Sequence, residues 1–204
     1  MQSIINKVNM KNHDIILASA SPRRETILSQ IGLKFIVIPS NTIEDFSIEL
    51  PPEAFCEHWA REKAKNIAKD YPKSYVIGAD TIVVLNGKIL GKPKNRDHSI
   101  SMLKSLSGKT HEVLTGLSII QMDSGVDFSI NESTFVEINT LTELDIINYI
   151  DIYKPYDKAG SYGIQDGFSV HIKKINGCFY NVMGLPTSKF HKHFLEIRKH
   201  RKVQ

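Results

Sequence analysis

Residues 17–32, "LASASPRRETILSQIG", place two serines and two adjacent arginines where an apolar strand runs into a helix. The start of a helix carries unpaired N–H groups and partial positive charge, so Arg23 and Arg24 each cost about 0.3–1 kcal/mol there. A bound anion reverses that sign, and Ser19 and Ser21 add hydroxyl donors of the kind that phosphates need. A solvated helix start with arginines paired to acids explains the stretch equally well.

Two acidic residues are candidates for metal binding or proton transfer. Asp80 stands in "VIGADT", which reads as a break between two apolar β segments at the edge of a cleft. A carboxylate there can bind a divalent ion or take a proton from water, although aspartate is also common in ordinary turns. Thr81 is either a strand residue or a ligand contact. Glu44 follows the second predicted strand and either shares a metal with Asp80 or is exposed.

Lys63 is unusual because it falls within the apolar stripe of a predicted helix, one turn from Trp59 and Ile67. Its stem must therefore cross a buried face. Either the ammonium reaches solvent past that face, or it enters a cleft beside Arg23 as a second phosphate donor. Lys92, in "LGKP", would be a third donor.

The segment "DKAGSYGIQ" is rich in groups that recognise small molecules. Gly160 and Gly163 allow close backbone approach, Tyr162 can stack, and Gln165 offers a donor and an acceptor to a base edge. Ordinary turns have a similar composition. His111 in "LSGKTH" is a further candidate, and the P-loop, GxGxxG and HExxH motifs are absent from the sequence.

The first half of the chain predicts two short strands, "DIILAS" and "KFIVIPS", separated by a helix that begins at Ser21-Pro22 and ends at Gly32. Pro51-Pro52 introduces a second helix that runs to about Ala68. Its buried stripe is predicted to contain Phe55, Trp59, Ala60, Ala64 and Ile67.

The second half predicts further strands, with turns at Asn86-Gly87 and Ser124-Gly125. Three helices are predicted: one capped by Asp97 and stopped at Gly108, one with a Thr142–Asp145 capping box, and a last one from Thr187. The segment "FSVHIKKINGCFYNV" is predicted to form a hairpin turned at Asn176-Gly177. Interspersed strands and helices indicate an α/β fold with a mixed sheet.

Composition favours a globular protein, with 204 residues, 41% hydrophobic and 24% charged. The net charge of +4 arises in residues 189–202, which carry six Lys or Arg against one Glu, so a solvated basic tail is favoured over an RNA- or membrane-binding patch. Cys56 and Cys178 show no disulfide or zinc spacing. The sequence contains neither a membrane-span-length apolar stretch nor a signal peptide, and we expect a cytoplasmic protein without a membrane partner.

Six motifs in order resemble the Maf family of nucleoside triphosphate pyrophosphatases: "LASASPRRETIL", "AREKA", "GADTIVVLNGKILGKP", "LSGKTHEVLTGL", "DKAGSYGIQ" and "KINGCFYNVMGLP". The resemblance covers about residues 14–195. It implies hydrolysis between the α- and β-phosphates with Mg²⁺ or Mn²⁺, and a homodimer. It also implies a long mixed β-sheet flanked by helices, bilobed with a central cleft, similar to inosine triphosphate pyrophosphatases.

The same resemblance implies roles for individual residues. Asp80 matches the proton acceptor, and Arg23, Thr81 and Gln165 match positions tied to substrate choice. We therefore expect Asp80, Lys63 and Arg24 to be catalytic and Asp80 and Glu44 to bind the metal. The expected substrate-binding residues are Ser19, Ser21, Arg23, Thr81, Lys92 and Gln165.

The motifs "GADT", "LSGKTH" and "DKAGSYGIQ" resemble the branch of the family that acts on dTTP and UTP, including removal of non-standard nucleotides. Alternatives are action on 7-methyl-GTP or another modified nucleotide, and a nucleotide-binding regulator of septum formation. A nucleic-acid partner is the least favoured interpretation. The expected organisation is an extension over 1–12, a catalytic domain over 13–196 and a basic tail over 197–204.

Overall fold

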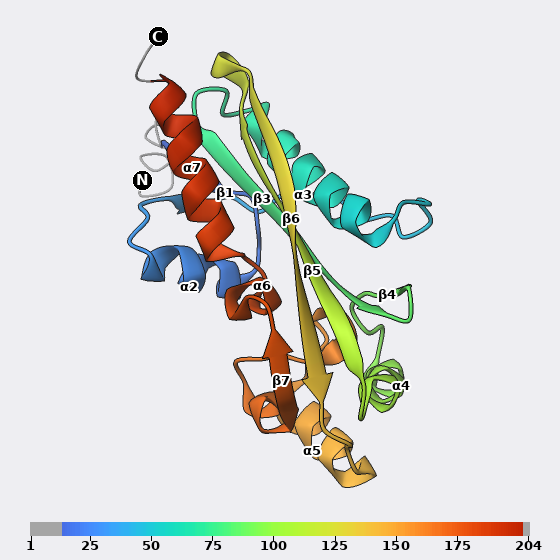
Figure 1. Cartoon of the computed structure of the whole chain (residues 1–204). Coiled ribbons are helices and arrows are strands. Elements are labelled where there is room, and N and C mark those ends of the chain that lie inside the picture. The colour runs from blue at the N-terminus through green and yellow to red at the C-terminus, as the bar shows by residue number, and fades with distance from the viewer. Residues whose placement is uncertain (1–13, 202–204) are drawn as a thin grey trace, which may run out of the picture. The chain divides into compact units, whose positions relative to one another are not determined.

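The structure is a computed structural model that describes residues 14–201, with the side chains described up to residue 199. Its seven-stranded sheet has the order β2-β1-β3-β5-β6-β7 (Figure 1). The seventh strand, β4, pairs with the last residues of β3. Parallel and antiparallel pairs both occur, so the predicted mixed sheet flanked by helices is confirmed. The predicted extension over 1–12 lies outside the described residues.

The chain divides into two compact units. Unit 1 comprises the residues up to Asp80, Gly116–Asn131 and the chain from Thr187 onward; unit 2 comprises Thr81–Thr115 and Glu132–Pro186. The strands β3 (Tyr75–Leu85), β5 (Thr110–Gln121) and β6 (Val126–Ile138) each contribute residues to both units. The central cleft that the resemblance implies stays a prediction.

The first described strand of unit 1 is β1 (Ile15–Leu17), which pairs in parallel with β2 (Ile36–Val37) and with β3. Its helices are α2 (Pro22–Gln30), α3 (Pro52–Ala68) and α7 (Thr187–Arg201), and the 3₁₀ turn Met122–Ser124 connects β5 to β6. Residues alternate between the two faces of a strand, so Gly78, which contacts α3, and Tyr75, which contacts Phe194 of α7, point in opposite directions. The helices α3 and α7 therefore cover opposite faces of β3 (Figure 1).

The helix α3 rests directly on strand backbone. A Cβ atom at Gly78 would lie 2.1 Å from the carbonyl oxygen of Ala60, and one at Gly116 would lie 2.1 Å from that of Cys56. The predicted stripe is confirmed, because Phe55, Trp59, Ala60, Ala64 and Ile67 are all buried. Glycine in these strands thus permits a close approach of helix and sheet.

That approach corrects one prediction. The motif "VIGADT" contains no break, since β3 runs without interruption from Tyr75 to Leu85. Asp80 therefore lies inside a strand and is buried, rather than at a strand end. Gly78 had suggested a turn, but here its missing side chain makes room for α3.

The predicted boundaries of α2 are confirmed. Ser21 is the N-cap residue and Pro22 the first helical residue, although no cap bond from the Ser21 side chain is found. After the helix, Gly32 has a φ of +74°, and its N–H and that of Leu33 bond back to the carbonyls of Ser29 and Leu28. A left-handed residue at this position closes the helix, as glycine allows.

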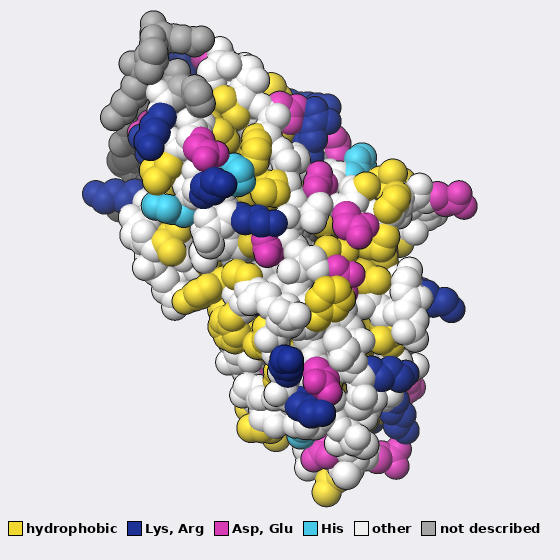
Figure 2. Space-filling view, in the orientation of Figure 1, with side chains coloured by type: hydrophobic (Ala, Val, Ile, Leu, Met, Phe, Trp, Pro, Cys, Tyr) yellow, Lys and Arg dark blue, Asp and Glu magenta, His cyan; other side chains and the backbone are white. Residues whose placement is uncertain are grey.

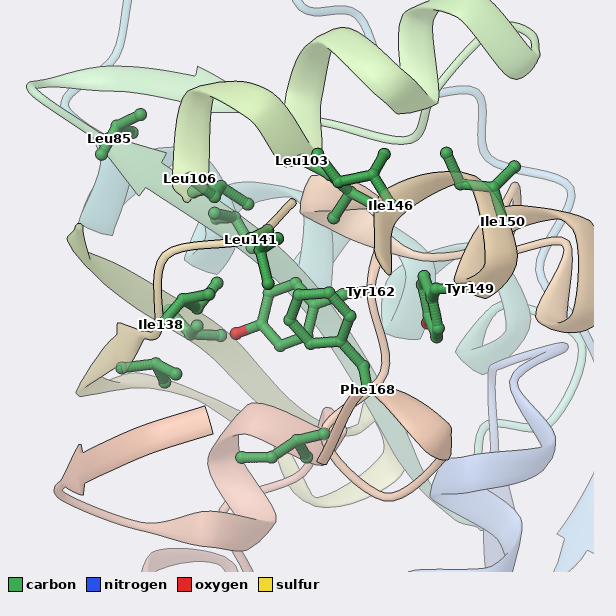
Figure 3. Packing of buried hydrophobic residues seen from close by; sticks show 14 residues of the cluster. Leu85, Leu103, Leu106, Ile138, Leu141, Ile146, Tyr149, Ile150, Tyr162 and Phe168 are labelled. Carbon is green, nitrogen blue, oxygen red and sulfur yellow. The ribbon is translucent and has the colours of Figure 1, made fainter. Parts of the chain in front are cut away.

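Unit 2 contains β4 (Lys88–Leu90) and β7 (Ile172–Asn176), with the helices α4 (Arg96–Leu106), α5 (Glu143–Tyr153) and α6 (Phe179–Met183). The 3₁₀ turns are Ala159–Ser161 and Gly167–His171. Helices α4 and α5 contact each other, and both supply side chains to one apolar core. Figure 3 shows this core, in which Leu103, Leu106, Ile146 and Ile150 surround the rings of Tyr149, Tyr162 and Phe168.

Two local predictions in unit 2 are confirmed. The β3–β4 hairpin turns at Asn86 and Gly87, whose positive φ angles of 50° and 76° match the type I′ turn expected of Asn-Gly. The capping box of α5 is present, since the side chains of Thr142 and Asp145 each accept a hydrogen bond from the other residue's backbone N–H.

Two other predictions in unit 2 are wrong. Asn95, not Asp97, caps α4, by accepting a hydrogen bond from the backbone N–H of His98. The hairpin predicted at Asn176-Gly177 is also absent, since α6 follows β7, which pairs instead with β6. Asn181 stabilises α6, because its buried amide donates to the carbonyl of Val113 and to Thr134 Oγ1.

The basic C-terminal segment continues α7 as far as Arg201. Figure 2 shows dark blue side chains over α7 interspersed with magenta, cyan and yellow ones. On this face the helix therefore has a mixed surface, as expected for a solvated segment. Among the residues that the structure describes, no helix is both long enough and apolar enough to cross a membrane.

Candidate active site

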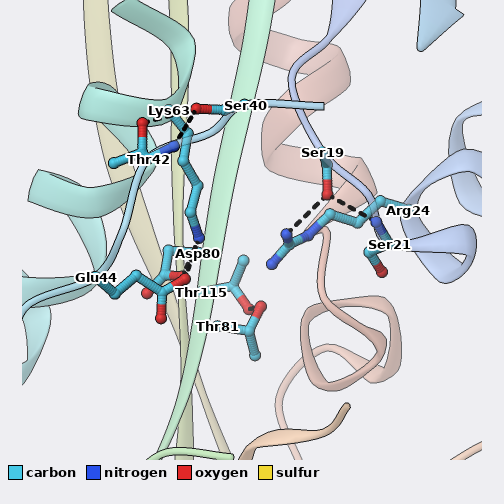
Figure 4. Close-up of polar contacts among 10 residues, drawn as sticks. All are labelled: Ser19, Ser21, Arg24, Ser40, Thr42, Glu44, Lys63, Asp80, Thr81 and Thr115. Carbon is cyan, nitrogen blue, oxygen red and sulfur yellow. Dashed lines mark hydrogen bonds and ion pairs between the residues drawn. The ribbon is translucent and has the colours of Figure 1, made fainter. Parts of the chain in front are cut away.

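Ser19 organises the junction between β1 and α2 in unit 1. Its Oγ atom accepts hydrogen bonds from Nη1 of Arg24 at 3.1 Å and from the backbone N–H of Ser21 at 3.2 Å. A hydroxyl group has two acceptor lone pairs and one hydrogen, so these bonds leave Ser19 with a hydrogen to donate. Figure 4 shows the Arg24 side chain folded back toward Ser19. The structure therefore places the Ser19 hydroxyl beside the Arg24 guanidinium, and their role as phosphate donors stays a prediction.

Arg24 is 9% exposed, although it lies in the first turn of a helix. Burial lowers the pKa of Arg24 from its usual value; Asp80 and Glu44 oppose that shift, and Arg23 adds to it. A guanidinium group stays protonated despite such a shift. The half-buried Arg23 is its immediate neighbour in the same turn. The Arg24 guanidinium thus lies within electrostatic reach of Arg23 and of two carboxylates, Asp80 and Glu44.

Lys63 links these two carboxylates. Its Nζ atom lies 2.6 Å from Oε1 of Glu44 and 2.6 Å from Oδ1 of Asp80 (Figure 4). The three side chains are 13%, 20% and 5% exposed, in the order Lys63, Glu44, Asp80. The sequence left open whether Lys63 reaches solvent or a cleft beside Arg23. Its ammonium instead bridges the two acids that were expected to share a metal.

Two different elements bring Lys63 and Asp80 together. Asp80 is two residues beyond Gly78, so both face α3, and Lys63 precedes Ala64, which lies against Gly78. The close seating of α3 on β3 therefore sets the position of the ammonium.

A loop without regular structure brings Glu44 to the same place. Ser40 Oγ accepts the backbone N–H of Thr42, lies 2.7 Å from Thr42 Oγ1, and donates to Oδ1 of Asn66 on α3. These bonds tie the loop to the helix that carries Lys63.

The two oxygen atoms of Asp80 have different surroundings. Oδ1 accepts the bond from Lys63, whereas Oδ2 is buried and has no hydrogen-bond partner among the described residues. Burial raises the pKa of Asp80; Lys63 opposes the shift most strongly, Glu44 adds to it, and Arg24 opposes it. A buried acceptor without a partner is costly, and such exceptions concentrate at functional sites.

The residues present fit a hard divalent cation. Glu44 and Asp80 both place an oxygen beside one positively charged group, and Asp80 has a second, unpartnered oxygen. The described residues contain no cluster of three or more acidic, histidine or cysteine side chains of the kind that encloses a metal. Magnesium is commonly held by one or two carboxylates with water and substrate phosphates, so two carboxylates suffice.

Thr81, the residue after Asp80, belongs to unit 2 and contacts Thr115 there. The two hydroxyl oxygens are 3.0 Å apart, and Thr115 donates its hydrogen to the carbonyl of Asn181 at 3.0 Å. Because Thr115 has only that one hydrogen, Thr81 is the donor of the pair. Sequence reasoning missed Thr115 and Asn181, since neither has a local pattern that points to Thr81.

The other predicted binding residues of unit 2, Lys92 and Gln165, are exposed. Tyr162 does not fulfil the expectation of a stacking platform. It is buried in the core beside Phe168, with its hydroxyl 2.7 Å from Nε2 of His111. Gly160 likewise serves internal packing, since a Cβ there would lie 2.9 Å from Val83.

His111 is a core residue in the structure, with 2% exposure. Burial lowers its pKa to about 4, so its ring is neutral near pH 7. Nδ1 is buried without a partner. If the ring hydrogen were on Nε2, both the Tyr162 O–H and Nδ1 would lack a partner. With the hydrogen on Nδ1, Tyr162 donates to Nε2 and only the Nδ1–H group lacks one, so this form is favoured. The pair thus joins the start of β5 to the segment that precedes Gln165.

Comparison with known proteins places this arrangement in a family. A family model described as "Maf-like protein" matches residues 14–197. The chain belongs to the Maf family. The resemblance carried by the six sequence motifs is thereby confirmed. The matched residues include every predicted site residue, from Ser19 to Gln165.

Curated Maf relatives match nearly the whole chain. A protein of Lachnoclostridium phytofermentans named dTTP/UTP pyrophosphatase is 44% identical over 194 residues, which are 92% of this chain and 95% of that protein. One of the same name from Thermoanaerobacter sp. is 47% identical over 176 residues, 86% and 92% of the two chains. Among solved structures, the Staphylococcus aureus Ham1 protein aligns with 61% of this chain and 71% of its own at a TM-score of 0.43 and 22% identity.

Proposed function

We propose that this protein hydrolyses dTTP and UTP to the nucleoside monophosphate and pyrophosphate. The names of relatives that are 44% and 47% identical over most of the chain support this activity. The observation that carries the proposal is Asp80: a buried carboxylate with one oxygen held by Lys63 and the other without a partner. It lies in the same unit as the donors Ser19 and Arg24.

In the proposed reaction, a water molecule attacks the α-phosphorus. A bond forms between the water oxygen and phosphorus, and the bond from phosphorus to the oxygen that bridges to the β-phosphate breaks. The bridging oxygen leaves with the electron pair as part of pyrophosphate. Asp80 Oδ2 takes the proton of the water, a role that burial supports by raising the pKa of the metal-free carboxylate.

The cationic groups of unit 1 bind the phosphates and stabilise charge on the leaving pyrophosphate. Arg24 is held by Ser19 in one orientation, so its fork need not be ordered again when substrate binds. The Ser19 hydroxyl donates to a phosphate oxygen, and Ser21 and Arg23 extend the donor set. Lys63 adds positive charge next to the acceptor carboxylate.

Glu44 and Asp80 would hold the divalent cation, Mg²⁺ or Mn²⁺. When bound, it polarises the phosphoryl group and neutralises charge. Asp80 can bind the cation and accept a proton at once because it has two oxygens: Oδ1, which is on the side of Glu44 and Lys63, would hold the cation, and Oδ2 is left for water. We assign selection of the base to Arg23, Thr81 and Gln165, and a further phosphate contact to Lys92.

A substrate panel tests the proposal. Pyrophosphate release is measured with Mg²⁺, Mn²⁺ or a chelator on dTTP, UTP, CTP, ATP, GTP, 7-methyl-GTP and modified pyrimidine triphosphates. The expected result is metal-dependent release that is fastest with dTTP, UTP or a modified form of them. Preference for 7-methyl-GTP would overturn the substrate assignment, and binding of dTTP without release in any metal would indicate a nucleotide-binding regulator.

The homodimer and the cytoplasmic location stay proposals that rest on family membership and composition. Light scattering during size-exclusion chromatography tests the dimer directly, since a single mass near 23.1 kDa would contradict it.

A further inference from the structure

Lys63 occupies the point at which two carboxylates converge. One ammonium nitrogen lies 2.6 Å from an oxygen of Glu44 and 2.6 Å from an oxygen of Asp80. A magnesium ion bound by the same oxygens would need distances of about 2.0–2.1 Å to each. Two cations cannot occupy this position together, so the ammonium and a divalent ion exclude each other there.

The two carboxylates need a positive charge between them whether or not a metal ion is bound. Asp80 and Glu44 are largely buried, and each raises the energy of the other's charged form. Buried like charges without compensation are costly, whereas one cation between them satisfies both. Without a metal, the fold supplies that cation from its own helix α3.

We propose that Lys63 is a built-in occupant of the divalent-cation position, which it leaves when the cation arrives with a nucleotide. The proposal rests on the proposed function for the identity of the nucleotide. In the free protein the ammonium stabilises the two carboxylates and competes with free metal ions. Once displaced, it stays on its flexible stem beside the site and is available to a phosphate oxygen.

Charge balance couples the two binding events. With all groups ionised, Arg23, Arg24 and Lys63 outnumber Glu44 and Asp80 by one positive charge. A divalent ion alone would raise that excess to three and would also displace the ammonium from its two partners. A metal bound to a triphosphate brings its own negative charge, so the protein favours the complex over the free ion.

The test measures Mn²⁺ binding to the full chain in the absence of nucleotide, by electron paramagnetic resonance of the free ion. Lys63→Met removes the ammonium and keeps an unbranched side chain. We expect Lys63→Met to bind Mn²⁺ at least about tenfold more tightly than the unmodified protein, because displacing a charge-assisted contact no longer opposes binding. An unchanged dissociation constant would overturn the proposal.

Two variants serve as matched controls. Lys65→Met removes the same charge from the same helix, but Lys65 is 41% exposed and contacts only Glu62 among the ion pairs described, at 3.9 Å. Lys63→Arg keeps a cation at the position itself. Both are expected to bind Mn²⁺ as weakly as the unmodified protein, and a tenfold gain in Lys65→Met would show that general charge, not occupancy, governs affinity.

A second measurement covers the case in which Lys63→Met folds poorly without metal. Its melting temperature should then rise with Mn²⁺ by more than that of the unmodified protein, and adding Asp80→Asn should abolish the extra rise. Equal shifts in both proteins would count against the proposal. None of these readouts uses hydrolysis, so failure of the substrate panel and failure of this inference are separate results.

Discussion

Two sets of buried polar side chains in this protein differ in charge: one is charged and the other is neutral. In unit 1, Glu44, Lys63 and Asp80 lie in contact as charged groups, and their opposite charges compensate one another. In unit 2, His111 and Tyr162 are also buried and hydrogen bonded to each other, but burial alone shifts their pKa values, without an opposite charge from the residues that the structure describes. Burial therefore keeps the His111 ring neutral near pH 7, where the Tyr162 hydroxyl is neutral in any surroundings.

The surroundings of each group determine what an unpartnered buried atom can do. Both groups contain one, Oδ2 of Asp80 and Nδ1 of His111. At Asp80 the atom belongs to a carboxylate that two cations stabilise, so it can accept a proton or bind a cation. At His111 it belongs to a neutral ring whose other nitrogen, Nε2, contacts the Tyr162 hydroxyl and so helps to position the segment before Gln165.

We expect the largest loss of activity when the carboxylate of Asp80 is replaced. Asp80→Asn keeps an oxygen for Lys63 but removes the base, so kcat for pyrophosphate release should fall about 10²- to 10⁴-fold while the protein stays folded. Steady-state kinetics with circular dichroism measures both. Asp151→Asn, which alters an exposed aspartate paired with Arg96, is the control and should keep full activity. A near-normal kcat in Asp80→Asn would remove the proton-acceptor role.

The next effect concerns binding. Arg24→Met removes a buried guanidinium that donates to Ser19 and offsets the charge of Asp80, so KM for dTTP should rise about tenfold to a hundredfold and the melting temperature should fall. Arg61→Met, at an exposed arginine that pairs with Asp127, should change neither value appreciably. If KM for dTTP is unchanged in Arg24→Met, the arginine is not a phosphate ligand.

A pH experiment addresses the neutral pair. The pKa of His111 is about 4 in the folded protein and about 6.5 when unfolded, so protonation favours unfolding. Its contribution to stability is complete above about pH 6.5 and decreases as the pH falls toward 4. Between pH 7 and pH 5 the free energy of unfolding should therefore fall by about 2 kcal/mol from this group.

His111→Phe should lose that part of the pH dependence, measured by urea unfolding at both pH values. His191→Asn alters an exposed histidine of α7 and is expected to retain it. The same pH dependence in His111→Phe as in the unmodified protein would show that His111 is not held neutral by burial.

The smallest effect is expected where opposite charges meet at the surface. Asp127→Asn removes an ion pair with Arg61 in which both side chains are more than 40% exposed, and it should change the free energy of unfolding by less than about 1 kcal/mol. Urea unfolding at low and high salt measures the change. A larger loss would mean that compensation of charge matters even without burial.

Local chemistry was enough to predict several elements. Pro22 and Gly32 marked the ends of α2, Asn86-Gly87 marked a hairpin, and the apolar spacing on α3 marked its buried face. Each of these features depends on residues close together in the sequence. The positive charge of Arg23 and Arg24 at a helix start is visible in the sequence for the same reason, and their role as phosphate donors stays a prediction.

The predictions failed where contacts between residues far apart in the sequence determine the structure. Gly78 looked like a turn residue, but its partner is the backbone of α3, about 18 residues earlier in the chain. The amide of Asn181 in α6 bonds to residues of β5 and β6, and the neighbours of Asn181 in the sequence give no sign of these contacts. Tyr162 was predicted to contact a ligand because its neighbours in the sequence give no sign of its hydrogen bond with His111, which is about 50 residues away in the chain.

The contact of α3 with bare strand backbone has a mechanical consequence. At most helix–sheet interfaces, a layer of side chains can rearrange and absorb small changes. At Gly78 and Gly116 that layer is missing, so an added methyl group must push the whole helix outward by about 1 Å to restore a normal separation. Because α3 moves as one unit, the displacement would also carry Lys63 away from Asp80. The two glycines therefore set the distance between the ammonium and the carboxylate.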